Sequence, residues 1–504
     1  MKILPKIRRV LGVVVLLAIT LLFLDFTGTL HRYLGWLAKI QLLPAVLALN
    51  VGVIVVLVVA TLLFGRVYCS VICPLGIFQD VASYLSGLRK KGRARLRFSF
   101  SKEVKWLRYG VWVLFVAALI AGVSAFVSLL APYSAYGRIV TNLFQPLYRW
   151  GNNLFAALSE RAGSYAFYEK EVWLKSLPTF IVAAVTFVGL ILLAWKGGRS
   201  YCNAVCPVGT TLSFFSRFAM FRPVIDADKC RNCKLCERGC KSSCIDISTH
   251  SIDYSRCVDC FNCLEECKFG ALHYKFAWGR KAAAQPAEGG DPSDSGRRAF
   301  LTAGAMLAGS LAVKAQEKKV DGGLAFIEKK KEPVRKGILV PFGAGSVKSF
   351  YDHCTACGLC ISQCPNRVLR PSDELEHLME PHMSFEAGYC RPECTVCSQV
   401  CPAGAILPVT PEEKTQIHIG FATVDLGLCV VNADGVSCGN CSRHCPAGAI
   451  HMVAKDADNP ESLLIPSVDK EACIGCGACE NLCPARPYSA IHVDGREVHT
   501  DTRV

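Results

Sequence analysis

Four long apolar stretches occupy the N-terminal part of the chain, near residues 9–26, 42–64, 108–130 and 177–195. As a helix, each is long enough to cross a hydrocarbon layer of about 30 Å. Beyond them the pattern changes to short apolar segments and loops that are rich in cysteine. We therefore expect a membrane α-helical bundle of four spans, followed by compact α+β modules.

Basic residues flank these stretches unevenly. Lys2, Lys6, Arg8 and Arg9 precede the first stretch, and Lys196 and Arg199 follow the fourth. By the positive-inside rule, the N-terminus, the segment between the second and third stretches and the chain after residue 195 face the cytoplasm. Residues 131–175, with mixed charge, face outside. The basic residues of the segment between the second and third stretches are Arg89, Lys90, Lys91, Arg93, Arg95, Arg97, Lys102, Lys105 and Arg108.

Composition agrees with a membrane protein. Of the 504 residues, 52% are apolar, which is unusual for a soluble chain of this size. A net charge of +15 would also suit a nucleic-acid-binding protein. The basic residues gather beside the apolar stretches, however, which is typical of membrane flanks. We expect lipid and no nucleic acid as a partner.

The 29 cysteines determine the chemistry to expect. They form tight groups, many with two residues between neighbouring thiols. Disulfide frameworks belong to small secreted domains, and structural zinc uses pairs of Cys-x-x-Cys without a third cysteine at the same spacing. The repeated triplets fit neither class, and they point to iron–sulfur clusters.

A short motif, R-x-Y-C-x-x-x-C-P-x-G, follows both the second and the fourth apolar stretch. Its cysteines are Cys69 and Cys73 in the first copy, and Cys202 and Cys206 in the second. The repetition indicates a parallel duplication, with both copies on the cytoplasmic side and four thiols converging. In a continuous helix, cysteines four residues apart would share a face. Two interpretations stay open: a metal or cluster site, or a helix-exit motif with free thiols.

Two polar residues near the outer end of the first stretch, Asp25 and His31, have two possible roles. They could belong to a quinol site. A single histidine is more often an anchor at the membrane interface.

The first cysteine-rich segment has the spacing of a bacterial ferredoxin with two clusters. In this arrangement each cubane takes three cysteines from one triplet and a remote fourth from the other group. Proline after the fourth cysteine is replaced by Lys241 and Lys268, and a ninth cysteine, Cys244, competes with Cys240. One predicted [4Fe–4S] site is Cys230, Cys233, Cys236 and Cys267, and the other is Cys257, Cys260, Cys263 and Cys240.

A segment rich in Ala, Gly, Pro, Ser and Asp at 281–296 reads as a flexible linker. After it, Arg297, Arg298, Phe300 and Leu301 precede a short apolar run that ends at Val313. This pattern resembles a twin-arginine export signal, for machinery that exports folded proteins. A basic linker before a buried helix is the alternative. Export would add a fifth crossing and place residues 316–504 outside.

The C-terminal part holds sixteen further cysteines in four groups, each ending in Cys-Pro. Four thiols per cubane give four [4Fe–4S] clusters, and six in the whole chain. Because the two middle groups are stretched, we expect one ferredoxin lobe nested inside another, with the first group paired to the fourth and the second to the third. The groups are Cys354, Cys357, Cys360 and Cys364; Cys390, Cys394, Cys397 and Cys401; Cys429, Cys438, Cys441 and Cys445; and Cys473, Cys476, Cys479 and Cys483.

These motifs resemble two families. Residues 1 to about 275, with four spans, both C-x-x-x-C-P motifs and a two-cluster module, resemble the NapH/MauN membrane ferredoxins. The rest resembles the NapG/MauM ferredoxins, which have a twin-arginine leader and stretched middle groups. The expected domains are a transmembrane domain (1–215), a two-cluster module (216–275), a linker with the apolar segment (276–345) and a four-cluster module (346–504).

The resemblance implies oxidation of membrane quinol and delivery of electrons to a periplasmic redox protein. We expect no substrate-transforming site, and there is no Cys-x-x-Cys-His haem motif. The alternatives are an accessory or maturation factor for a partner metalloenzyme, a redox sensor, or a carrier whose clusters all face the cytoplasm. After export, the two ferredoxin modules would lie on opposite faces of the bilayer. A four-thiol site on the cytoplasmic face would not bridge the distance between their clusters.

Overall fold

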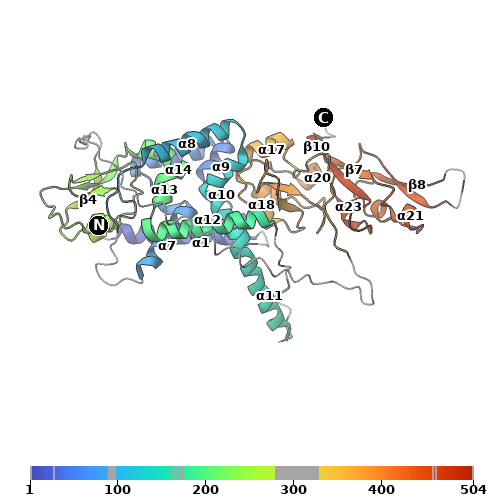
Figure 1. The fold of residues 1–504 in the computed structure, drawn as a ribbon, viewed down its shortest axis with the longest axis horizontal. Coiled ribbons are helices and arrows are strands. Elements are labelled where there is room, and N and C mark those ends of the chain that lie inside the picture. Colours follow the sequence, from blue (N-terminus) through green and yellow to red (C-terminus); the bar gives the residue numbers. More distant parts are fainter. Residues whose placement is uncertain are drawn as a thin grey trace, which may run out of the picture.

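The computed structural model describes residues 3–25, 29–88, 98–161, 163–164, 167–169, 172, 175–277, 328–456, 459 and 462–501. Three parts follow one another along the long axis in Figure 1. A first cysteine module (221–277) lies at one end, a helical bundle (3–216) in the middle, and a second cysteine module (328–501) at the other end. The expected linker and the Arg297–Arg298 pair lie outside the described residues.

The bundle is built around α1 (Leu4–Leu24), α5 (Val51–Phe64), α8 (Lys105–Ile120) and α12 (Leu177–Gly197). Of these, α1, α8 and α12 run along the long axis in Figure 1. Among the described residues, α1 and α12 are long and apolar enough to cross a membrane, and α5 is a shorter apolar helix. By length and composition alone, these two helices are suited to membrane association. The short elements beside them are α2 (Thr29–Leu34), α3 (Trp36–Lys39), α4 (Leu42–Leu47), α9 (Ser124–Leu130), α10 (Pro132–Ile139) and the π-helical turn η2 (Val140–Phe144).

Two of the four expected stretches are not continuous helices. The stretch 42–64 divides into α4 and α5, because the Asn50 side chain accepts a hydrogen bond from the Val53 amide and starts a new helix. The stretch 108–130 divides into α8 and α9 at Gly122, whose φ of +74° ends the first helix. Apolar composition predicted the location of these segments but not their breaks.

The duplicated motif forms the same local structure twice. Each long helix ends at a glycine with positive φ, Gly65 or Gly198, and a five-residue helix follows, α6 (Val67–Val71) or α13 (Ser200–Ala204). A proline then opens α7 (Pro74–Leu88) or α14 (Pro207–Ser216). Cys73 and Cys206 therefore lie beyond the short helices, and the expected shared helix face between cysteines four residues apart is not formed.

The first cysteine module is small and loop-rich. β1 (Phe221–Ile225) pairs antiparallel with β4 (Leu272–Phe276), and β2 (Ile245–Asp246) pairs with β3 (Ser251–Ile252). Two short helices, α15 (Leu235–Arg238) and α16 (Asn262–Glu266), follow the cysteine loops. The buried core of the module consists largely of cysteines and aliphatic side chains.

The second cysteine module has three two-stranded antiparallel sheets. They pair β5 (Leu369–Pro371) with β6 (Pro381–Met383), β7 (Ile417–Val424) with β10 (Ile491–Asp501), and β8 (Ile450–Ala454) with β9 (Leu464–Val468). Its helices are short: α17 (Val347–His353), α18 (Leu359–Gln363), α19 (Val396–Val400), α20 (Pro411–Lys414), α21 (Val430–Ala433), α22 (Asn440–Arg443) and α23 (Ala478–Leu482).

Helix α1 contacts both modules, one at each end. Near its start, Arg9 Nη2 lies 2.7 Å from Glu265 Oε2 of α16 in the first module. At its far end, Gln363 Nε2 of α18 in the second module donates to the Leu22 and Asp25 carbonyls at 3.0 and 2.6 Å. The 21 residues of α1 therefore separate the two cysteine modules.

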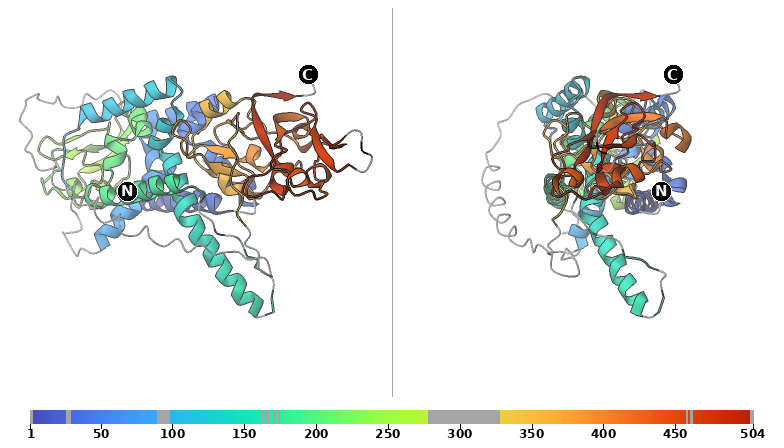
Figure 2. Two further views of the ribbon diagram at one scale, coloured as in Figure 1. Left: turned by 45° about the vertical axis from the view of Figure 1, so that its right-hand side comes forward. Right: turned by 90° about the vertical axis from the view of Figure 1, so that its right-hand side faces the viewer.

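One long helix stands apart. α11 (Gln145–Arg161) projects away from the other described segments in both views of Figure 2. Leu147, Trp150, Leu154 and Leu158 recur at helical spacing, and each is at least half exposed. They form an apolar stripe without a protein partner among the described residues.

Candidate iron–sulfur sites

The first module holds a cavity lined by the four thiols that the ferredoxin spacing predicts together: Cys230, Cys233, Cys236 and the remote Cys267. The loop between the first three coils tightly, because Asn232 and Lys234 adopt left-handed backbone conformations at φ of 50° and 56°. That geometry turns successive thiols toward one centre.

The second cavity of this module is lined by Cys257, Cys260 and Cys263 from the second triplet and by Cys240 from the first group. Cys244 also lines it, and its Sγ lies 3.5 Å from Cys240 Sγ. Five thiols thus surround a place where a cubane takes four. The expected competition between Cys240 and Cys244 for the fourth iron is compatible with this geometry.

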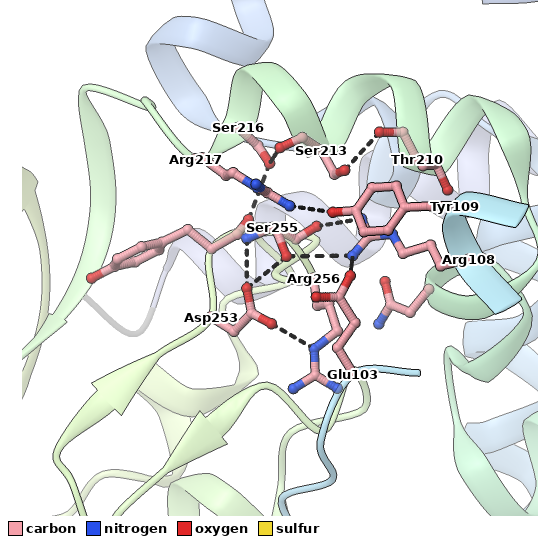
Figure 3. Close-up of polar contacts among 12 residues, drawn as sticks. Glu103, Arg108, Tyr109, Thr210, Ser213, Ser216, Arg217, Asp253, Ser255 and Arg256 are labelled. Atoms are coloured by element: carbon pink, nitrogen blue, oxygen red, sulfur yellow. Dashed lines mark hydrogen bonds and ion pairs between the residues drawn. The ribbon is translucent and has the colours of Figure 1, made fainter. Parts of the chain in front are cut away.

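Polar contacts fix the loop before Cys257 to the bundle, as Figure 3 shows. Arg108 of α8 donates through Nη2 to the Ser255 carbonyl at 3.0 Å, and its Nη1 meets Glu103 Oε1 at 2.5 Å. Asp253 accepts from Ser255 Oγ at 2.6 Å and from Arg256 Nε at 2.7 Å. The second cavity of the first module is therefore held rigidly against the helices.

In the second module, neighbouring groups exchange their fourth cysteine. Cys364, which ends the first group, lines one cavity with Cys390, Cys394 and Cys397 of the second group. In return, Cys401 of the second group lies beside the first triplet, Cys354, Cys357 and Cys360.

The other two groups are exchanged in the same way. Cys445 of the third group lines a cavity with Cys473, Cys476 and Cys479 of the fourth. Cys483 of the fourth group lies near Cys441, and Cys441 lies near Cys438. Cys429 precedes them at the start of α21 and is buried in the same core.

The expected nested pairing, first group with fourth and second with third, is therefore wrong. The extra residues between the first and second cysteines of the middle groups lengthen loops and do not decide which groups pair. Pairing follows chain order, because each fourth cysteine follows a short helix, directly or after one residue, and these helices pack in pairs, α18 on α19 and α22 on α23.

The donor sets fit cubane clusters. Each cavity is lined by thiols in the three-plus-one pattern in which every iron takes one cysteine. Among the described residues, no three His, Cys, Asp or Glu side chains come close enough together to hold a single metal ion.

Lys414, a buried lysine beside one of these loops, was not predicted from the sequence. Its Nζ donates to the Arg391 and Cys394 carbonyls, both at 2.6 Å, and lies 3.2 Å from Cys390 Sγ. The only local signal is the capping box of Thr410 and Glu413, which places the short helix α20 that carries it. A cation here stabilises an anionic cluster.

In the bundle, the two copies of the duplicated motif bring four thiols together. Cys69, Cys73, Cys202 and Cys206, called here the four-thiol site, are all buried and close enough for charge on one to act on the others. The predicted convergence is present. The Ser70 carbonyl of the first copy packs against Gly12, inside α1, so the site lies beside that helix.

The arginine that opens each motif copy reaches across to the other copy. Arg199 Nη1 donates to the Cys69 carbonyl at 2.6 Å, and Arg66 Nη2 donates to the Cys202 carbonyl at 3.3 Å. The last glycine of each copy makes room for this crossing. A Cβ on Gly76 would lie 2.7 Å from Arg199 Nη1, and one on Gly209 would lie 2.6 Å from Arg66 Nη2.

Asp25 and His31 lie at the junction of the bundle with the second module. Asp25 is buried, and its Oδ2 accepts from the Leu30 amide at 2.9 Å. His31 lies next to Gln399 of the second module. These two residues connect parts of the protein, and a quinol role for them stays a prediction.

Comparison with known proteins agrees with the cysteine geometry. A family model described as a 4Fe-4S binding domain matches residues 46–93 and 179–224, which contain the two motif copies. A second, described as a 4Fe-4S dicluster domain, matches residues 353–405 and 436–486, which contain the two exchanged pairs of groups except Cys429. No solved structure matches the chain.

Several known proteins are similar to parts of the chain. An uncharacterized protein of Methanocaldococcus jannaschii is 26% identical over 54% of this chain and 87% of its own length. The methylamine utilization ferredoxin-type protein MauM of Methylobacillus flagellatus is 32% identical over 35% of this chain and 76% of its own length. The ferredoxin-type protein NapG of Escherichia coli is 30% identical over 38% of this chain and 81% of its own length. The chain therefore belongs to the MauM/NapG ferredoxin-type proteins and is an iron–sulfur electron-transfer protein with [4Fe–4S] clusters.

Proposed function

We propose that this protein conducts electrons across the cytoplasmic membrane, from quinol to a periplasmic redox protein, through six [4Fe–4S] clusters. The observation that carries the proposal is the position of α1. One apolar helix, long enough to cross a membrane, contacts a cysteine module at each end. Two cysteine modules separated by a spanning helix lie on opposite faces of the bilayer.

Charge supports the orientation. Arg8, Arg9, Lys196 and Arg199 all lie at the end of the bundle that contacts the first cysteine module. An excess of basic residues marks the cytoplasmic ends of spans. The first module is therefore cytoplasmic in this proposal, and the second is periplasmic.

Connectivity supports export of the second module. The described chain leaves the first module at Ala277 and resumes at Glu328, in the second module at the other end of the bundle. The residues between them include Arg297 and Arg298 of the twin-arginine-like motif. A translocation signal is needed at this place if the module folds with its clusters before crossing.

The architecture corresponds to a membrane ferredoxin of the NapH/MauN type joined to a MauM/NapG-type polyferredoxin. The match of residues 46–93 and 179–224 to a 4Fe-4S binding domain supports the first part, and the relatives named MauM and NapG support the second. Such a fusion joins the quinol side and the acceptor side of one electron route in a single chain.

The topology is tested by protease accessibility of a C-terminal epitope. Cleavage in intact spheroplasts, without permeabilisation, is expected if the second module is periplasmic. Protection in spheroplasts together with cleavage in inverted vesicles would refute export and favour a carrier whose clusters all face the cytoplasm.

The electron route is tested with menaquinol or ubiquinol added to anaerobic membranes that contain the protein. Reduction of the clusters, followed by electron paramagnetic resonance, is the expected result. Clusters that stay oxidised under excess quinol but are reduced by dithionite would refute the quinol route and favour an accessory role for a partner metalloenzyme.

A further inference from the structure

We infer that Cys69, Cys73, Cys202 and Cys206 jointly hold one additional cubane iron–sulfur cluster, which relays single electrons between the two cysteine modules. The relay role rests on the proposed conduit, whereas the cluster itself does not. Each motif copy supplies only two thiols, so neither can ligate a cubane alone. The bundle brings both copies to one buried place.

Two buried arginines, one from each motif copy, place positive charge beside the thiols. Arg66 and Arg199 are fully buried, and their guanidinium groups lie 3.8 Å from Cys69 Sγ and 3.9 Å from Cys202 Sγ. Gln79 Nε2 points at Cys202 Sγ from 3.3 Å, and the Gly209 amide points at Cys206 Sγ from 3.4 Å. N–H donors aimed at the sulfurs of a cluster stabilise its negative charge.

The buried charges around the thiols do not balance without an anion. Asp80 forms ion pairs with three cations, Arg8, Arg199 and Lys241. Among the described residues, no carboxylate forms an ion pair with the Arg66 guanidinium, although Asp259 accepts from the Arg66 backbone amide. The guanidinium donates to Asn203 Oδ1, to two backbone carbonyls and toward Cys69, and its Nε has no hydrogen-bond partner. An unpaired buried guanidinium is strongly unfavourable. An oxidised cubane with four thiolates is a dianion and supplies the missing negative charge.

The site lies between the cluster cavities of the two modules. Toward the first module, Arg66 Nη1 donates to the Ser255 carbonyl at 3.0 Å, and its backbone amide donates to Asp259 at 2.9 Å. Both residues belong to the loop that carries Cys257 and Cys260. Arg66 therefore links the four-thiol site directly to that loop through hydrogen bonds.

Toward the second module, the intervening element is α10. Tyr201, directly before Cys202 in the second motif copy, donates from its hydroxyl to the Leu130 carbonyl at 3.1 Å, just before α10 begins. On α10, Gly137 packs so closely on the second module that a Cβ there would lie 2.3 Å from the Cys357 carbonyl. One buried cluster of side chains includes Cys69, Cys73, Cys206 and Cys357.

The step is a one-electron exchange. The Cys257-containing cluster is oxidised by one electron and the bundle cluster is reduced by one; the bundle cluster then reduces the Cys357-containing cluster and returns to its oxidised state. The four-thiol site lies beside Gly12, three residues after Arg9, which contacts the first module, and ten residues before Leu22, which contacts the second. It therefore divides one long electron transfer into two shorter ones.

The test compares the full-length protein with a Cys69→Ser/Cys202→Ser variant and with Ser70→Ala as a matched control in α6. We expect about 28 iron atoms and as many acid-labile sulfides per chain in the wild type and the control, against about 24 in the double variant. One electron paramagnetic resonance signal should be missing from the variant, while the signals of the remaining six clusters show that it folded.

Arg66→Gln keeps all four thiols and removes one buried cation beside them. The signal that the cysteine variant lacks should persist in it, with a lower midpoint potential, because the reduced cluster is more negative. A cysteine variant with full iron, sulfide and signals would overturn the cluster. A variant that loses the cluster yet passes electrons from quinol to the second module at the wild-type rate would overturn the relay. If the wild-type second module itself stays oxidised with quinol, the proposed conduit fails while the iron count is unaffected, so the failures are distinguishable.

Discussion

Replacing Gly137 with alanine perturbs the contact between the bundle and the second cysteine module at a single atom. The new Cβ would lie 2.3 Å from the Cys357 carbonyl oxygen and 2.8 Å from Cζ of Phe23. Ordinary contact begins near 3.4 Å, so α10 and the cysteine loop must separate by about 1 Å. The carbonyl belongs to the backbone of a loop whose thiols face a cluster cavity, and it cannot turn away freely.

Overpacking of this kind costs about 1–3 kcal/mol. This free energy weakens docking of the second module on the bundle, because Gly137 belongs to the bundle and Cys357 belongs to the second module. Since about 1.4 kcal/mol changes an equilibrium tenfold, we expect local opening of the junction to increase about 5- to 150-fold. Gly189→Ala in α12 is the control, because no atom lies within 4 Å of its Cβ position.

Hydrogen exchange of the full-length protein measures this opening directly. Amides of α18 and of α10 should exchange faster in Gly137→Ala than in Gly189→Ala, whereas amides of β8 and β9, far from the junction, should be unchanged. Equal exchange in the two variants would refute the reasoning, because the second module would then not depend on the α10 contact.

Three other variants test stability and placement. Arg335→Ala leaves the Glu480 carboxylate buried without its bidentate partner at 2.7 and 2.9 Å, so the free energy of unfolding of the second module should fall by about 3–5 kcal/mol in denaturant titrations; exposed Arg443→Ala should change it by under about 0.5 kcal/mol. Burial lowers the pKa of His499 to about 4, so the folded state takes up this proton less readily than the unfolded state. Its contribution is therefore present above about pH 6.5 and declines below it, by up to about 2 kcal/mol at pH 5, and His499→Gln should flatten that decline in unfolding measured against pH. If the stripe on α11 lies in the membrane interface, brominated lipid should quench wild-type tryptophan fluorescence more than that of Trp150→Phe, and equal quenching would contradict it.

The sequence predicted which cysteines bind clusters better than it predicted which cysteines share a cluster. Two-residue gaps between thiols follow from the geometry of a cubane, so triplets such as Cys473, Cys476 and Cys479 are recognisable by spacing alone. Which remote cysteine completes each set depends on how short helices pack, as α18 packs on α19. The spacing of cysteines along the chain does not determine how these helices pack. The nested pairing was inferred from loop lengths, and loop lengths do not determine which groups pair.

The apolar pattern likewise predicted where helices lie but not where they stop. Asn50 and Gly122 interrupt stretches whose mean composition suits a continuous span, because a capping side chain and a left-handed glycine act on the backbone locally. The duplicated motif was visible as a repeat, and its convergence followed from parallel duplication. The function of its first and last residues was not visible, since Arg66 and Gly209 meet only across the two copies.

In the proposed conduit, the position of the four-thiol site along α1 determines how the two modules exchange electrons. If the motif copies only marked helix exits, their thiols would lie at the cytoplasmic surface and leave the whole length of α1 between the two sets of clusters. In the structure the Ser70 carbonyl instead packs on Gly12, and Arg66 reaches back to the loop of Cys257 and Cys260. A glycine at position 12 permits this close approach, and a larger side chain there would push the motif away from α1. The same apolar helix that separates the modules therefore packs against the four-thiol site between them, as the proposed electron conduit requires.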